Sequence, residues 1–327
     1  MFWRTVFSAQ SRPGPEGRLS ILIFHRVSPQ PDLLFPGEVD AERFDRMLGW
    51  MRNWFHVLPL AEAVQRLAEG RLPARAAAIT FDDGYADNAT EATPLLQKHG
   101  LSATFFVSAG FLDGSCMWND GVIESIRHSR RERLDLGALD PALPQESVPL
   151  ATLEQRRAAI AAVLGRVKYL PMEQRVPLVA RLAEACGTEL PRGLMMSPDQ
   201  LRGMQRAGMC IGAHTMTHPI LATLDDAAAR FEINESRRVL EGIIGTRVGL
   251  FAYPNGKPGQ DYNLRSVELV REAGFDAAVA TAWGTATRET DRFQLPRFTP
   301  WDQSRTRFAA RMAQNLMRRE TLPALLS

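Results

Sequence analysis

The sequence contains little cysteine: Cys116, Cys186 and Cys210 are the only three in 327 residues. They are odd in number, widely spaced and never arranged as Cys-x-x-Cys, which argues against a disulfide scaffold and against a structural zinc knuckle. Cysteines used in this way are compatible with the reducing cytoplasm.

The sequence also lacks a large excess of charge of either sign. It has 39 lysine and arginine residues against 37 aspartate and glutamate residues, which gives a net charge of +2. Proteins that bind nucleic acid concentrate basic residues on one surface, so we expect no nucleic-acid partner. The apolar content of 45% is ordinary for a globular protein, and nothing in the sequence predicts an oligomeric state.

Long apolar runs are absent too, since none approaches the roughly 20 residues that span a bilayer. Residues 1–17 have only a short apolar stretch, which Arg4 and then prolines interrupt, so they make a poor signal peptide. We therefore expect a cytoplasmic protein without a transmembrane segment. The aromatic start at 1–3 and an amphipathic stretch at 307–327 could form a peripheral membrane contact, but a helix packed on a globular domain gives the same pattern.

Short apolar runs alternate with helical patterns along most of the chain. The predicted strands are 19–27, 76–81, 102–111, 208–215, 248–254 and 275–282. The predicted helices between them are 41–52, 60–70, 88–100, 225–245 and 263–275. Strands that alternate with helices are joined by crossovers and run parallel, so we predict an α/β fold in which a closed barrel of mostly parallel strands is surrounded by helices.

This alternation breaks between about residues 119 and 198. The region contains a proline-rich stretch at 139–150 and helical patterns at 152–170 and 172–187. We interpret it as a helical insertion in a loop on one face of the barrel. The predicted organisation is an N-terminal segment at 1–18, a barrel at 19–302 that contains the insertion, and a C-terminal helix at 303–327.

Polar side chains follow four of the predicted strands. His25 follows the apolar run 21–24 of the first strand, Asp82 and Asp83 follow the second strand, His214 stands in the fourth with His218 close behind, and Pro-Asn-Gly at 254–256 follows the apolar run 250–253 of the fifth. Loops at the carboxyl ends of barrel strands build active sites. Adjacent carboxylates disfavour each other's ionisation, so a neighbouring group must offset their charge. A hairpin turn could explain Asp-Gly, but a helical pattern follows it instead of a second strand.

The histidine pair in His-Thr-Met-Thr-His-Pro is not the helical zinc-protease motif. That motif has glutamate where this chain has Thr215, and Pro219 keeps His218 out of helical geometry. Two histidines alone could serve structural hydrogen bonds. Together with one carboxylate, however, they form a ligand set that leaves open positions for water, as in catalytic Zn²⁺ sites. We therefore predict a single divalent metal, with one aspartate as ligand and its neighbour free as a base.

Two of these motifs resemble those of a known family. Thr-Phe-Asp-Asp-Gly at 80–84 and His-Thr-x-x-His-Pro at 214–219, in this order, are similar to the first two motifs of the polysaccharide deacetylases, the NodB-homology family. The resemblance covers about residues 19–302. It implies a distorted (β/α) barrel that removes N- or O-acetyl groups from a sugar polymer with the help of a metal.

Carried over by position, the resemblance gives each motif residue a role. Asp82 is the general base, and the metal ligands are Asp83, His214 and His218. Phe-Ala-Tyr-Pro-Asn-Gly at 251–256 resembles the third motif, in which the backbone amide of Asn255 helps to stabilise the oxyanion.

The sequence departs from the family at three motifs. The third motif has Ala252 where many members have an arginine, the fourth is not recognisable, and the last has Arg297 where others have the histidine that acts as general acid. A subset of the family with Phe-His-Arg at the end of the first strand, as at 24–26 here, takes its acid from that strand. This resemblance implies that His25 is the general acid and that Arg297 orients Asp82.

One alternative applies to these departures and two apply to the function. His25 could merely cap a strand, in which case the protein would be impaired or inactive. The chain could also be an amide hydrolase for a small molecule, or a non-catalytic glycan-binding relative, although a binding site needs no free base beside a metal. We expect an acetylated glycan as the substrate, contacted by Tyr253, Pro254 and Trp283.

Overall fold

The computed structural model describes residues 2–139, 146–168, 170–299 and 302–318. The chain divides into two compact units. The barrel unit comprises Met1–Gln30, Glu38–Leu112 and Met196–Ser327. The helical unit comprises Pro31–Gly37 and Asp113–Met195, where the sequence predicts an insertion at about 119–198.

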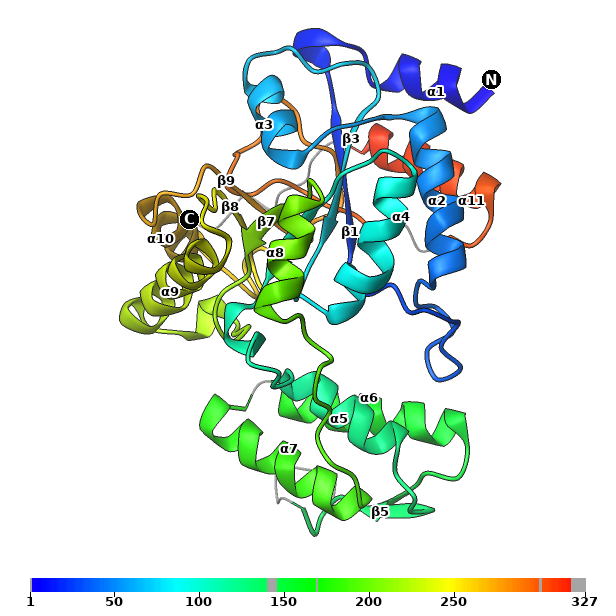
Figure 1. Ribbon diagram of the computed structural model, residues 1–327, viewed down its shortest axis with the longest axis vertical. Helices are drawn as coiled ribbons and strands as arrows, with labels where there is room; N and C mark the ends of the chain where they lie inside the picture. The colour runs from blue at the N-terminus through cyan, green and yellow to red at the C-terminus, as the bar shows by residue number, and fades with distance from the viewer. Residues whose placement is uncertain (1, 140–145, 169, 300–301, 319–327) are drawn as a thin grey trace. The chain divides into compact units, whose positions relative to one another are not determined.

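The barrel unit is built on one parallel sheet (Figure 1). Its strands, in spatial order, are β1 (Leu19–Phe24), β3 (Ala76–Phe81), β4 (Thr104–Val107), β7 (Cys210–Ala213), β8 (Leu250–Ala252) and β9 (Ala277–Val279). All neighbouring strands run parallel, and β2 (His56–Val57) pairs with the beginning of β3. The six predicted strands are confirmed, whereas β2 has only two residues and is too short for its pattern to be recognised.

The curled sheet is closed by an irregular extended segment, residues 295–298. Leu295 forms a parallel bridge with Val279 of β9, and Phe298 forms one with Leu22 of β1. The Ile23 N–H donates to the Phe298 carbonyl at 3.1 Å, so the segment adds backbone hydrogen bonds to the free edge of β1. The predicted distorted (β/α) barrel is confirmed, and its distortion lies where this segment replaces a regular strand.

Side chains of the strands alternate between the inside and the outside of the barrel, as the strand period of two requires. One buried cluster collects the inward set, which includes Leu19, Ile21, Ala76, Ala78, Phe106, Ala252 and Val279. Small residues make room for the Phe106 ring, because a Cβ on Gly212 would lie 2.4 Å from it. Helix α3 (Leu60–Ala68) adds three side chains to the same cluster.

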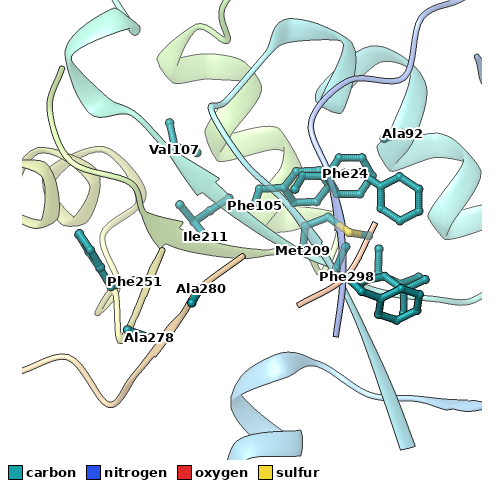
Figure 2. Close-up of a cluster of buried hydrophobic side chains, with 14 of the residues drawn as sticks. Phe24, Ala92, Phe105, Val107, Met209, Ile211, Phe251, Ala278, Ala280 and Phe298 are labelled. Atoms are coloured by element: carbon teal, nitrogen blue, oxygen red, sulfur yellow. The ribbon is translucent and has the colours of Figure 1, made fainter. Parts of the chain in front are cut away.

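The outward set packs under the surrounding helices. These are α1 (Phe2–Gln10), α2 (Ala41–Trp54), α4 (Thr93–Lys98), α8 (Pro198–Arg206), α9 (Asp226–Ile244), α10 (Leu264–Glu272) and α11 (Arg305–Met317). Figure 2 shows part of this outer core, which includes Phe24 and Phe105. Phe81 stacks on both, with ring centroids 5.3 Å and 4.7 Å apart. These contacts fix the ends of β1, β3 and β4 side by side.

The helical unit consists of α5 (Trp118–Arg127), α6 (Leu153–Val167), α7 (Met172–Cys186) and a hairpin of β5 (Arg133–Asp135) with β6 (Ser147–Pro149). Arg156 joins these parts, since its guanidinium donates to four carbonyls, those of Ile126, Arg127, Ser129 and Leu150. Helices α6 and α7 correspond to the two helical patterns of the sequence. The hairpin was not predicted, and residues 140–145 of the proline-rich stretch lie outside the described residues.

In the described part of the C-terminal segment, the amphipathic pattern belongs to a helix that packs on the barrel unit. Helix α11 buries Phe308, Met312 and Leu316 in the outer core, which also takes Phe7 of α1. Residues 319–327 and Met1 lie outside the described residues. In the part of the chain that the structure describes, no helix is both long and apolar enough to cross a membrane.

Candidate active site and metal centre

Most of the predicted site residues lie on loops that follow β1, β3, β7 and β8, at one end of the barrel, whereas Arg297 and Trp283 follow β9. These loops carry unusual backbone conformations. Five non-glycine residues in the described chain have a positive φ, and four of them belong to the loops: Asp83, Thr215, His218 and Asn255. Non-glycine residues pay a conformational penalty there, and such strain gathers at functional sites.

Asp83, His214 and His218 form one cluster in which one ligand atom from each residue lies within 4.8 Å of the other two. Asp83 Oδ1 is 3.4 Å from His214 Nε2 and 3.5 Å from His218 Nε2. Ligands held about 2.1 Å from a tetrahedral Zn²⁺ would be about 3.4 Å apart. The three side chains therefore fit a metal ion with its fourth position left to water.

Two features prepare the imidazoles for a cation. The Nδ1–H of His214 donates to the Ala252 carbonyl at 2.8 Å, so Nε2 is the nitrogen that faces Asp83 and could bind a cation. Burial lowers the pKa of His218 to about 4, against the opposing charge of Asp83. His218 is therefore neutral at pH 7, and neutral imidazole is the form that binds metals.

The adjacent aspartates point to different partners. Both oxygens of Asp82 accept hydrogen bonds from Arg297, at 2.7 Å each. Burial raises the pKa of Asp82, but the charges of Arg297 and His214 outweigh this effect and hold the pKa below its ordinary value. A glycine must follow the pair, because Gly84 has φ +94° and a Cβ there would lie 2.9 Å from Val107.

Arg297 is fully buried, and each nitrogen of its guanidinium donates a hydrogen bond. Besides Asp82, it donates to the Ala280 carbonyl at 3.0 Å and to the Thr80 hydroxyl at 3.2 Å. Its guanidinium also lies over the Phe106 ring, 5.6 Å from the centroid. The contact of Arg297 with Asp82 that the sequence led us to expect is thus present.

Glu232 on α9 is a site residue that the sequence analysis missed. Its carboxylate accepts hydrogen bonds from the N–H groups of Met216 and Thr217, at 2.8 and 2.9 Å, and from the Thr217 hydroxyl at 2.6 Å. It thereby braces the loop between the two histidines. The signal was a carboxylate among the buried positions of α9, which are otherwise Ala229, Ile233, Ser236 and Leu240.

His25 and Asn255 lie on the rim of the site. The His25 side chain is exposed, and its charge is among those that lower the pKa values of Asp82 and Asp83 against the effect of burial. Asn255 has a left-handed backbone, and its carbonyl accepts a hydrogen bond from the Thr281 hydroxyl at 2.7 Å. No acceptor among the described residues takes the Asn255 N–H, so it is available to a substrate oxygen.

The predicted substrate contact of Tyr253 needs correction, because the Tyr253 side chain is fully buried in the outer core. The Tyr253 hydroxyl donates to the Phe293 carbonyl at 2.9 Å, and its ring stacks on Tyr262 with centroids 4.0 Å apart. Tyr253 therefore supports the loop after β8 from the outer core, and a substrate contact of Pro254 stays a prediction. Trp283 is 39% exposed and lies beneath the guanidinium groups of Arg311 and Arg318. Its contact with a substrate stays a prediction.

Replacing Glu232, which holds the loop between the two histidines, should weaken metal binding. We expect Glu232→Ala to lower metal affinity about 10–100-fold, the usual effect of losing a group that orients metal ligands. A competition titration of Zn²⁺ against a chromophoric chelator measures this change. Glu235→Ala is the matched control. Glu235 belongs to the same helix, but its carboxylate pairs with Arg238 on the surface. Equal affinities of Glu232→Ala and Glu235→Ala would contradict the role of Glu232.

Replacing Arg297 should leave the Asp82 carboxylate buried and without its partner. We expect Arg297→Met to lower the free energy of unfolding by about 3–5 kcal/mol at pH 7, as for other broken buried ion pairs. Urea unfolding measures the loss. Arg265→Met, which removes an arginine paired with Asp226 on the surface, should change little.

The loss of unfolding free energy in Arg297→Met should depend on pH. In the wild type, the pKa of Asp82 is lowered, so its stabilising effect is present at neutral pH and is lost as the pH falls toward that pKa. Without Arg297, burial raises the pKa, and the folded variant takes up a proton at higher pH. The difference in unfolding free energy should therefore narrow from pH 7 to pH 5. A constant difference would show that Asp82 is not the group concerned.

The comparisons with known proteins point to the same family as the sequence motifs of the site. The family model for polysaccharide deacetylase matches residues 69–278. YxkH of Bacillus subtilis (strain 168) is 21% identical over 292 residues, which are 89% of this chain and 74% of that protein.

Two solved structures share the fold. The Streptococcus pyogenes deacetylase PplD, in complex with acetate, has a TM-score of 0.59 at 18% identity, over 92% of this chain and 99% of that one. The de-N-acetylase of Aggregatibacter actinomycetemcomitans also has a TM-score of 0.59, at 15% identity, over 90% of this chain and 99% of that one. From the span of the family match, the chain belongs to the polysaccharide deacetylase family.

Proposed function

We propose that this protein is a metal-dependent hydrolase that removes N-acetyl or O-acetyl groups from a polysaccharide or oligosaccharide and releases acetate. One observation carries the proposal: Asp83, His214 and His218 form a three-ligand set beside Asp82, a carboxylate that Arg297 keeps ionised. A ligand set with an open position next to a free base is what hydrolysis of an amide or ester requires.

In this proposal one divalent metal, most typically Zn²⁺, is held by the three ligands. When bound, such an ion polarises a carbonyl group and makes a water molecule more acidic. Asp82 accepts the proton of the attacking water, and Arg297 keeps Asp82 ionised for that task. The Asn255 N–H donates to the oxygen that gains charge, an interaction commonly worth about 3–4 kcal/mol. His25 donates a proton to the leaving nitrogen, because an amide anion is too poor a leaving group.

The ion pair of Asp82 also bears on the alternatives. A glycan-binding relative would have no use for a buried base held ionised beside a ligand set, so this pair favours an enzyme. An amide hydrolase for a small molecule would use the same groups, and the choice of substrate distinguishes it. The cytoplasmic location stays a proposal that rests on the use of cysteine in the sequence.

Acetate release tests the function directly. Purified protein should release acetate from at least one member of a panel of acetylated oligosaccharides. A chelator should abolish the release, and added Zn²⁺ should restore it. Acetate release that persists in chelator would contradict the metal dependence. Activity confined to acetylated small molecules would favour the alternative hydrolase.

Asp82→Asn and Asp83→Asn should impair the protein in different ways. Asp82→Asn should lower turnover by about 10²–10⁴-fold, since a general base is lost, while the protein still binds Zn²⁺. Asp83→Asn should weaken Zn²⁺ binding itself, because a ligand is lost. Metal analysis after dialysis, together with acetate release, separates the two effects. Equal loss of metal in both variants would show that the division of roles is wrong.

A further inference from the structure

The loop after β1 is held at three successive residues. The His25 carbonyl accepts a hydrogen bond from Asn88 Nδ2 at 2.9 Å. The next residue, Arg26, donates through Nε to Asp87 Oδ2 at 2.8 Å. The N–H of Val27 donates to Asp87 Oδ1 at 3.3 Å. Two successive residues that follow β3 thus hold this loop, with backbone contacts at the His25 carbonyl and at the Val27 N–H.

This grip is buried and internally connected. Asn88 is fully buried and Asp87 is only 8% exposed. Asn88 Nδ2 also donates to Asp87 Oδ1 at 3.1 Å, so the two side chains fix each other. The Arg26 guanidinium lies over the Tyr85 ring, 4.9 Å from its centroid. Hydrogen bonds in such surroundings are strong and hold one geometry.

The backbone of Asn88 is fixed as well. Asn88 begins a π-helical turn, η2 (Asn88–Ala92), and its carbonyl accepts a hydrogen bond from the Thr93 hydroxyl at 2.8 Å. Turns of this kind are rare and often occur at functional sites. Here the turn directs the Asn88 side chain back toward β1, and the same loop carries Asp82 and Asp83 only a few residues earlier.

We propose that Asp87 and Asn88 are positioning residues for His25. The imidazole itself is exposed, so its place at the site depends on the backbone that carries it. A proton donor must come within hydrogen-bond reach of the leaving nitrogen, and a displacement of about 1 Å can cost 10²-fold in rate. Because Asp87 and Asn88 belong to the loop of the aspartates, they tie His25 to the base and the ligand set. The inference rests on the proposed function.

The kind of substrate distinguishes this role from a merely structural one. Asn88→Ala should lower the turnover of an N-acetylated oligosaccharide about 10–100-fold. It should leave the turnover of 4-nitrophenyl acetate near that of the wild type, because nitrophenolate leaves without a proton. The affinity for Zn²⁺ should not change. Asp87→Asn, which keeps the shape of the side chain but loses its charge beside Arg26, should show a weaker form of the same pattern.

A double variant and a distant control complete the test. Asn88→Ala combined with His25→Ala should be no slower on the amide than His25→Ala alone, since Asn88 acts through His25. Asp45→Ala removes a carboxylate that pairs with Lys98 and His99 elsewhere in the barrel unit, and it should leave the ratio of amide to ester turnover unchanged. Additive losses, or equal losses on amide and ester, would overturn the inference.

A readout without turnover separates this inference from the function. In proton NMR spectra, the imidazole signals of His25 can be identified by their absence in His25→Ala. The chemical shifts of these signals should move toward those of a free histidine in Asn88→Ala but not in Asp45→Ala. Unmoved signals would overturn the positioning role even if the wild type releases acetate. A wild type that releases no acetate would contradict the proposed function, whatever the signals show.

Discussion

The site depends on one buried ion pair, that of Arg297 with Asp82. Two adjacent carboxylates would otherwise repel each other or compete for the same cation. The planar guanidinium takes both oxygens of Asp82, which leaves Asp83 as the nearer carboxylate to His214 Nε2, at 3.4 Å against 4.0 Å for Asp82. Such a pair is costly to bury and more costly to break, which makes this division of the aspartates a stable property of the folded chain.

The same arginine links the chemistry to the fold. Strands β9 and β1 form the two edges of the curled sheet, and residues 295–298 fill the space between them. Within this segment Leu295 donates its N–H to Ala278 at 3.0 Å and Arg297 donates its N–H to Ala282, also at 3.0 Å. The segment that closes the barrel therefore also delivers the partner of Asp82, so the geometry of the base depends on correct closure.

The sequence predicts the strands and the ligand set because both leave local signals. Apolar runs mark the six strands, and polar residues at their ends mark the site. The carboxylate of Glu232 on the apolar face of α9 was a local signal, but its hydrogen-bond partners were not predictable, since they depend on how α9 packs under a loop 15 residues earlier in the chain. The error at Tyr253 was avoidable. Side chains alternate along β8, and Tyr253 shares the outer cluster with Phe251, whereas Ala252 faces inward.

The central claim is that Arg297 keeps Asp82 out of the coordination sphere while Asp83 enters it. Anomalous diffraction from crystals grown with Zn²⁺ at neutral pH tests this claim most directly. The account predicts one metal peak about 2.0–2.2 Å from an Asp83 oxygen and from the Nε2 atoms of His214 and His218, with both Asp82 oxygens still bonded to Arg297. A metal liganded by Asp82, with Arg297 displaced from that carboxylate, would contradict it.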